Sequence, residues 1–160
     1  MRIAIIAALP GELKPLVKGW QRVATNVHGI KKWILTRGAD TWIAVCAGMG
    51  AEAAMRAFAS AVSDGPVDML LSVGWAGSLD PEVHPGTAHV PTVVIDAQTG
   101  EQFSLTEGKR QSRLVTTARV ADEAEKRRLA ATYPGAVLVD MEAAAVARLA
   151  EMHGIPLLCL

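Results

Sequence analysis

Residues 137–156 read VLVDMEAAAVARLAEMHGIP and contain a strand, a helix and a chain break in that order. The pattern predicts a buried strand over Ala136 to Val139 and a helix that opens at Asp140 and runs to about His153. Gly154 and Pro156 end that helix, and Ile155 to Leu160 begins a further apolar strand. A helix between two apolar strands is the repeating unit of an α/β fold.

The same alternation extends outward in both directions. Arg2 to Ala8, Thr41 to Ala47 and Val67 to Val73 are apolar runs that predict buried strands. A helix is expected between Gly50 and Val62, and another over Asp122 to Thr132, where Glu123 and Arg127 have the spacing of an ion pair. The other expected elements are a helix over 12–20, strands over 32–36, 88–95 and 114–117, and a surface loop over 96–110. The sequence therefore predicts one α/β domain over residues 1–160, with helices on both faces of its sheet.

Composition limits the classes of function. Hydrophobic residues make up 51% of the chain and charged residues 20%, with a formal net charge of +0. This describes a packed protein without the basic field that holds a nucleic acid. The basic clusters Lys109-Arg110 and Lys126-Arg127-Arg128 lie among polar residues and are interpreted as solvated surface.

The chain is expected to work in the cytoplasm, away from membranes. Its opening MRIAIIAALPGEL is too short to span a bilayer and reads as a core strand, not as a signal peptide. Cys46 and Cys159 lie inside apolar runs, which predicts buried reduced thiols and a reducing compartment. His28, His84, His89 and His153 show no spacing typical of metal ligands, so no metal is expected.

Residues 48–53, GMGAEA, fit the Gly-x-Gly-x-x-Ala fingerprint of dinucleotide sites. Such a site also needs an acidic residue at the end of the next strand, to bind the ribose hydroxyls. The next strand runs instead into Val73-Gly74-Trp75. Two other interpretations remain open: a tight turn without a ligand, or a turn that lines a small anion or ribose site.

Four segments together resemble the methylthioadenosine/S-adenosylhomocysteine nucleosidases and their purine nucleoside phosphorylase relatives. They are MRIAIIAALPGEL at 1–13, CAGMGAEAA at 46–54, DMLLSVGWAGSLDPEVHPG at 68–86 and VLVDMEAAAVARLAEMHGIP at 137–156. The last is similar to the family's Val-Glu-Met-Glu-Ala helix start. The resemblance implies a phosphorylase-like three-layer α/β/α sandwich around a mixed central sheet, and cleavage of a nucleoside's N-glycosidic bond. It also implies a homo-oligomer and no cofactor, with phosphate as co-substrate if the enzyme is a phosphorylase.

The resemblance places roles on particular residues. Glu12 falls where the nucleosidases keep the acid that activates water, although a first-turn acid also suits the helix dipole. Glu142 falls on the acid that holds the ribose hydroxyls, although a capping role in the first turn of the helix also suits it. Met141 would pack on the sugar or belong to the core, and Asp140 is expected to be an N-cap. The other substrate-binding residues implied are Gly48, Met49, Gly50, Trp75, Ala76 and Gly77.

Three departures from the family pattern affect the expected site. Trp75 stands where the nucleosidases have a serine, so the size or polarity of the pocket is expected to differ there; as an aromatic plug, Trp75 would narrow or close the site. No phenylalanine for base stacking occurs around Arg119-Val120-Ala121. The family's general acid lies just beyond the strand that begins at Ile155, whereas this sequence ends at Leu160. We therefore expect the family's C-terminal strand-helix segment to be missing. General acid assistance contributes about a hundred- to ten-thousand-fold in rate, so leaving-group catalysis would be impaired.

Water is favoured over phosphate as the nucleophile. Superfamily phosphorylases bind phosphate with arginines near the glycine turns, whereas Gly11 is followed by Glu12 and Lys14. Arg56 and Arg119 are the candidates if phosphate is used. The alternatives are a phosphorylase, including a specialised hopanoid-linked branch, and a module that binds a nucleoside without turnover.

Overall fold

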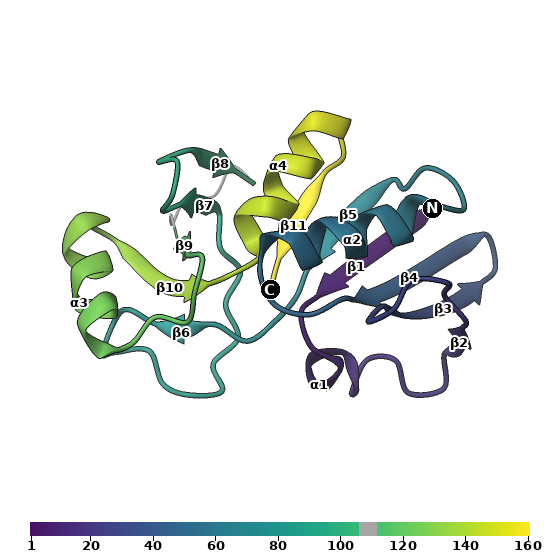
Figure 1. The fold of residues 1–160 in the computed structure, drawn as a ribbon, viewed down its shortest axis with the longest axis horizontal. Coiled ribbons are helices and arrows are strands. Elements are labelled where there is room, and N and C mark those ends of the chain that lie inside the picture. Colours follow the sequence, from purple (N-terminus) through teal and green to yellow (C-terminus); the bar gives the residue numbers. More distant parts are fainter. Residues whose placement is uncertain (106–111) are drawn as a thin grey trace.

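The computed structural model describes residues 1–105 and 112–160, whose strands form two mixed sheets (Figure 1). The first sheet has six strands in the order β11-β5-β1-β4-β3-β2, and the second has five in the order β6-β10-β9-β7-β8. The strands are β1 (Arg2–Ala7), β2 (Gln21–Val23), β3 (Lys31–Arg37), β4 (Asp40–Cys46), β5 (Met69–Ser72), β6 (Gly77–Ser78), β7 (Val93–Asp96), β8 (Gln102–Ser104), β9 (Arg113–Thr116), β10 (Ala136–Asp140) and β11 (Leu157–Cys159). The helices are α1 (Pro10–Leu13), α2 (Ala51–Val62), α3 (Glu123–Thr132) and α4 (Ala143–His153).

Each sheet has a parallel centre. β1 pairs in parallel with β4 and β5, and β11 continues this set beyond β5. β9 likewise lies parallel to β7 and β10, whereas β6 and β8 are antiparallel edge strands. The predicted α/β class is confirmed. The expected central sheet is divided into two hydrogen-bonded sheets in the structure.

Helices cover both faces of the sheets, which makes three layers. In β1, Ala4 and Ile6 face the core beneath α2 and α4, whereas Ile5 and Ala7 pack with Leu13 of α1. In the second sheet, Leu114 and Leu138 join the α2/α4 core, and Val115 and Val139 pack with Leu129 of α3. This alternation follows from the two-residue period of a strand. The predicted three-layer arrangement is present, with α2 and α4 on one side and α1 and α3 on the other.

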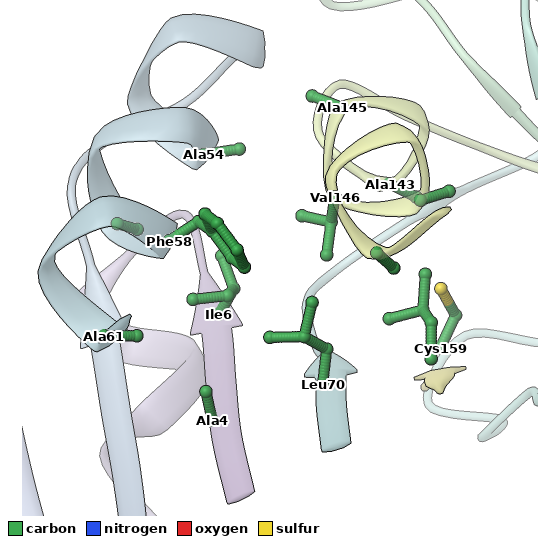
Figure 2. Packing of buried hydrophobic residues seen from close by; sticks show 14 of the residues in the cluster. Ala4, Ile6, Ala54, Phe58, Ala61, Leu70, Ala143, Ala145, Val146 and Cys159 are labelled. Carbon is green, nitrogen blue, oxygen red and sulfur yellow. The ribbon is translucent and has the colours of Figure 1, made fainter. Parts of the chain in front are cut away.

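The α2/α4 layer is packed closely because its helices present small side chains. Phe58 of α2 and Val146 of α4 lie above Ile6 and Leu70, and Ala143 is close by (Figure 2). All of these side chains are buried. This core fixes the start of α4 against β1 and β5, the strands whose ends form the candidate site.

The structure corrects several predicted boundaries. The helix expected over 12–20 ends at Leu13, because Pro15 has no N–H to donate to a continuing helix. The helix expected to open at Asp140 begins at Ala143, since β10 extends through Asp140. The strand expected over 88–95 begins only at Val93.

The loop predicted over 96–110 was wrong in part. Its residues Gln102–Ser104 form β8, which pairs with β7 so that Val94 lies opposite Phe103. Residues 106–110, with the basic cluster Lys109-Arg110, lie outside the described residues. The strands β2 and β6 were not expected, because three and two residues are too short to show a pattern.

Other local predictions are confirmed. Arg127 and Glu123 form the expected ion pair at 3.0 Å. Cys46 and Cys159 are free and buried, and burial raises the pKa of the Cys159 thiol to about 12. Across the described part of the chain, no helix combines the length and apolar character needed to cross a bilayer.

Candidate active site

Two adjoining cavities open where β1, β5 and β10 end. Their volumes are about 510 and 410 Å³, and both are lined by Glu12, Trp75, Lys126, Asp140 and Glu142. The first extends under residues 83–91, and the second extends toward residues 119–121. Ligand sites of α/β proteins commonly lie at the carboxyl ends of parallel strands. The predicted acids thus come together at such a place.

Glu12 is held by three backbone N–H groups. Its Oε2 accepts hydrogen bonds from Ala8 at 3.0 Å and Leu9 at 2.7 Å, and its Oε1 accepts one from Trp75 at 2.9 Å. The bond from the Leu9 N–H caps α1, which is a structural role that the sequence analysis did not assign to Glu12. A carboxylate offers about four lone-pair sites, so one site on Oε1 remains for a ligand or water. Capping and chemistry are therefore compatible in this side chain.

Glu142 lies at the start of α4 and reaches across to the glycine turn before α2. Its Oε1 accepts a hydrogen bond from the Gly50 N–H at 2.6 Å. Burial raises the pKa of the Glu142 carboxyl, and the nearby Asp140 and Glu12 carboxylates raise it further, whereas the Gly50 bond lowers it. Backbone bonds from Gly50 and Met141 stabilise the ionised form of Glu142, whereas its surroundings favour protonation. A ligand with hydroxyl donors or positive charge would stabilise the ionised form further.

Asp140 is not the N-cap that the sequence predicted, since Glu142 occupies that position, but it accepts the capping hydrogen bonds of α4 from the end of β10. Its Oδ2 accepts hydrogen bonds from the N–H groups of Ala143 at 2.7 Å and Glu142 at 3.1 Å. The Thr116 hydroxyl donates to Oδ1 at 2.6 Å and accepts from the Ala144 N–H at 3.0 Å. Burial is the main cause that raises the pKa of the Asp140 carboxyl, against these bonds. Asp140 thus joins β10, β9 and α4.

The turn after β5 brings Trp75 to the mouth of both cavities. The side chain is 70% exposed, and its ring packs over Gly11, where an added Cβ would lie 3.0 Å from the ring. An added Cβ at Gly74 would lie 3.1 Å from Glu12 Oε1. Glycine at both positions lets Trp75 and Glu12 approach the backbone. Ala76 lines both cavities and Gly77 the second.

The glycine turn before α2 contributes less directly to the cavities. Gly48 and Gly50 have φ angles of 105° and 90°, which glycine adopts without strain. Met49 lines the second cavity, as does Met141. Gly48 lines neither cavity, and Gly50 acts through its bond to Glu142. In a dinucleotide site, the Gly50 N–H of this turn would be available to a phosphate, but here it donates to Glu142.

Sequence reasoning missed several cavity residues. Lys126 lines both cavities, although its cluster was interpreted as solvated surface. His84 and His89 line the first cavity, and His89 Nε2 is buried without a hydrogen-bond partner among the described residues. Arg119 lines the second cavity, whereas Arg56 donates to the Ala47 carbonyl at 3.1 Å. Only the helical register of Lys126 relative to buried Leu129 signalled an inward position.

Fold and cavities together define an α/β protein in which Glu12, Asp140 and Glu142 line two cavities at the ends of its parallel strands. The chain belongs to the phosphorylase superfamily, whose family model matches residues 2–114, more than half of its length. This confirms the superfamily resemblance predicted from the sequence motifs. A comparison with curated proteins finds no match.

Solved structures of nucleosidases and a hydrolase match the fold over nearly the whole chain. A futalosine hydrolase mutant of Helicobacter pylori is 15% identical with a TM-score of 0.85, covering 99% of this chain and 87% of that one. An S-adenosylhomocysteine nucleosidase from Streptococcus pyogenes, in complex with 5-methylthiotubericidin, is 20% identical with a TM-score of 0.84, at coverages of 99% and 81%. A 5'-methylthioadenosine/S-adenosylhomocysteine nucleosidase from Neisseria meningitidis, in complex with methylthio-immucillin-A, is 18% identical with a TM-score of 0.86, at coverages of 99% and 83%. At these identities the likeness shows the fold alone.

Proposed function

We propose that this protein cleaves the N-glycosidic bond of a purine nucleoside, such as methylthioadenosine or S-adenosylhomocysteine, with water as the nucleophile. The observation that carries the proposal is the meeting of Glu12 and Glu142 at two adjoining cavities. These acids come from separate helix starts, at the positions that the superfamily motifs assign to them. The bound nucleoside analogues of the Streptococcus and Neisseria structures support a nucleoside as the ligand class.

Glu12 acts on the water in this mechanism. As the bond between C1′ and the base nitrogen breaks, positive charge develops on the ribosyl group and a water oxygen bonds to C1′. Glu12 takes one proton from that water through the free lone pair of Oε1. Its three backbone bonds hold the carboxylate in one orientation, so little reorganisation is needed during reaction.

Glu142 and Met141 act on the sugar. The free oxygen of Glu142 accepts hydrogen bonds from the ribose hydroxyls, and its negative charge stabilises the ribosyl cation. Met141 lies beside it on the wall of the second cavity and offers an apolar contact to the ring. The Gly50 bond sets the direction of Glu142, which gives the glycine turn an indirect part in sugar binding.

A phosphorylase remains the second candidate because of Arg119, a cation on the wall of the second cavity. Phosphate held there would replace water as the nucleophile. Arg56 supports this reaction less, since its guanidinium donates to the backbone carbonyl of Ala47.

Two further proposals concern the setting of the protein. A homo-oligomer is supported by Met49, Trp75 and Val120, which are large, exposed and apolar around the second cavity. Analytical ultracentrifugation would detect it, and a monomer at micromolar concentration would exclude it. The buried free thiols of Cys46 and Cys159 support a reducing, cytoplasmic compartment.

The proposed function is tested by release of free base, followed by chromatography. The panel contains methylthioadenosine, S-adenosylhomocysteine, adenosine, inosine and guanosine, each with and without phosphate. Release without phosphate is the expected result. Release that requires phosphate would establish the phosphorylase, and no release in either buffer would leave a nucleoside-binding protein.

A further inference from the structure

Lys126 occupies a position that the mechanism above does not use. It projects from α3 toward β6, where an added Cβ at Gly77 would lie 3.2 Å from its Cε and 3.4 Å from its Nζ. The side chain is partly buried and lines both cavities. Over residues 1–105 and 112–160, no hydrogen bond or ion pair holds this ammonium group.

Its neighbours on the same helix behave differently. Arg127 pairs with Glu123 at 3.0 Å, and Arg128 pairs with Glu125 at 2.6 Å, both on the solvent side. These residues form the solvated surface that the sequence predicted for the whole cluster. Lys126 therefore differs from its neighbours in two ways: its side chain extends toward the cavities, and it has no partner among the described residues of its own helix.

Negative and positive side chains reach the cavities from different elements of the fold. Glu12 and Glu142, with the buried Asp140, contribute negative charge at the ends of β1 and β10. Lys126 adds positive charge from α3, on the opposite helix layer from α4. A bound molecule thus meets carboxylates and an ammonium group together. This arrangement suits a reaction in which one part of the substrate becomes positive and another negative.

We propose that Lys126 is a leaving-group residue, whose ammonium contacts the departing base and stabilises the negative charge that develops on it. The inference rests on the proposed function. As the C1′–N bond breaks, its electron pair stays with the base, and Lys126 donates an N–H to an acceptor atom of that base. The released base then takes one proton from solvent, while Glu12 returns to solvent the proton that it took from water. The net reaction consumes one water for each nucleoside.

The experiment compares Lys126→Met with wild type on substrates that differ only in the leaving group. We expect kcat to fall about 100-fold with a purine nucleoside, the usual effect of losing one preorganised donor to a developing anion. The leaving group of 4-nitrophenyl riboside needs little assistance, so with this substrate we expect kcat to fall by less than about tenfold. Lys126→Arg, which keeps the charge, should recover part of the purine activity. Equal losses with both substrates, or no loss with either, would overturn the proposal.

Arg127→Met is the matched control, because it removes a neighbouring cation that points to solvent. It should leave both rates unchanged, and thermal unfolding of both variants checks the fold. If Lys126→Met fails to fold, Lys126→Gln takes its place.

A binding measurement separates this proposal from the proposed function. If wild type releases no base from any nucleoside, the proposed function fails. Calorimetric titration of free adenine, the base of the proposed substrates, then decides the role of Lys126. A dissociation constant for the base that is at least about tenfold higher in Lys126→Met than in wild type, which corresponds to about 1.4 kcal/mol, would support contact between Lys126 and the base. Equal affinity of the two proteins, or no binding by wild type, overturns it.

Discussion

The starts of α1 and α4 each need a helix cap and each place a carboxylate at the cavities, but they do so with different numbers of residues. Each helix follows the end of a parallel strand and carries a carboxylate at the cavities. At α1, Glu12 both caps the helix and faces the cavity, so its oxygens already hold three amides. At α4 the two roles are divided: Asp140 accepts the hydrogen bonds that cap the helix, whereas Glu142 accepts one from Gly50 in the turn before α2.

This difference has consequences for substitution. A change at Glu12 alters local structure and chemistry together, whereas changes at Asp140 and Glu142 separate the two. The carboxylate with more bonds is fixed in direction, which suits action on a water molecule. The carboxylate with fewer bonds keeps acceptor sites free, which suits a sugar with several hydroxyl groups.

The largest effect is expected at α1. Glu12→Gln keeps the size of the side chain but cannot take a proton, so base release should fall about 100- to 10,000-fold. Stopped assays with chromatography measure it, with thermal unfolding as the check on the cap. The nearby Lys14→Met is the control and should keep wild-type activity, because Lys14 lines neither cavity. A Glu12→Gln protein with normal activity would remove Glu12 from the mechanism.

Glu142→Gln should lower kcat/KM for nucleosides by about 100-fold, because it removes the charge opposite the ribosyl cation. A 2′-deoxy nucleoside lacks one of the hydroxyl groups that Glu142 is proposed to hold. The variant should therefore lose less with this substrate than with the ribonucleoside. Identical losses with the two sugars would contradict sugar binding by Glu142.

Asp140 tests the division of work at α4. Asp140→Ala removes two hydrogen bonds from backbone N–H groups and leaves the Thr116 hydroxyl without its acceptor. This should lower the free energy of unfolding by about 1–3 kcal/mol. Asp140→Asn keeps acceptor geometry and should lose less. The exposed α3 cap, Asp122, gives a matched comparison: Asp122→Ala should cost about 1 kcal/mol. Urea unfolding measures all three variants, and a larger loss at Asp122 than at Asp140 would reverse this ranking.

The smallest effect is expected in the pH profile. Glu142 must be ionised to hold the sugar, and its pKa is raised mainly by burial. Activity should therefore fall as pH drops through this raised pKa, above the ordinary glutamate value of about 4.3. Because Asp140 also raises the Glu142 pKa, Asp140→Asn should move the fall in kcat/KM to lower pH. A fall that stays in place in Asp140→Asn would show that another group causes it.

The same raised pKa values set the pH dependence of stability. A carboxyl whose pKa is higher in the folded protein binds protons more tightly there than in the unfolded chain. The contribution of Asp140 and Glu142 to stability is therefore greatest at pH values below the pKa that each group has in the unfolded chain. It is lost as the pH rises through the higher pKa that each group has in the folded protein. Removing either carboxyl should flatten this part of the stability curve.

The family resemblance predicted the site residues that follow a single strand, and the local strand-helix pattern placed them at the strand ends. Glu12 and Glu142 follow β1 and β10 within a few residues, so their place at the strand ends follows from topology. Lys126 could not be placed in this way, because its approach to Gly77 depends on how α3 packs under a strand of two residues. The inward positions of His84 and His89 likewise depend on a loop without periodic structure.

In the proposed reaction, water attacks the sugar with Glu12 as the base. The most direct test identifies the sugar product when a cleaved nucleoside is incubated with the protein in phosphate buffer. Free base and free sugar are the expected products, released at the same rate when phosphate is left out. Sugar 1-phosphate as the product would contradict the proposed reaction, and so would base release that depends on phosphate.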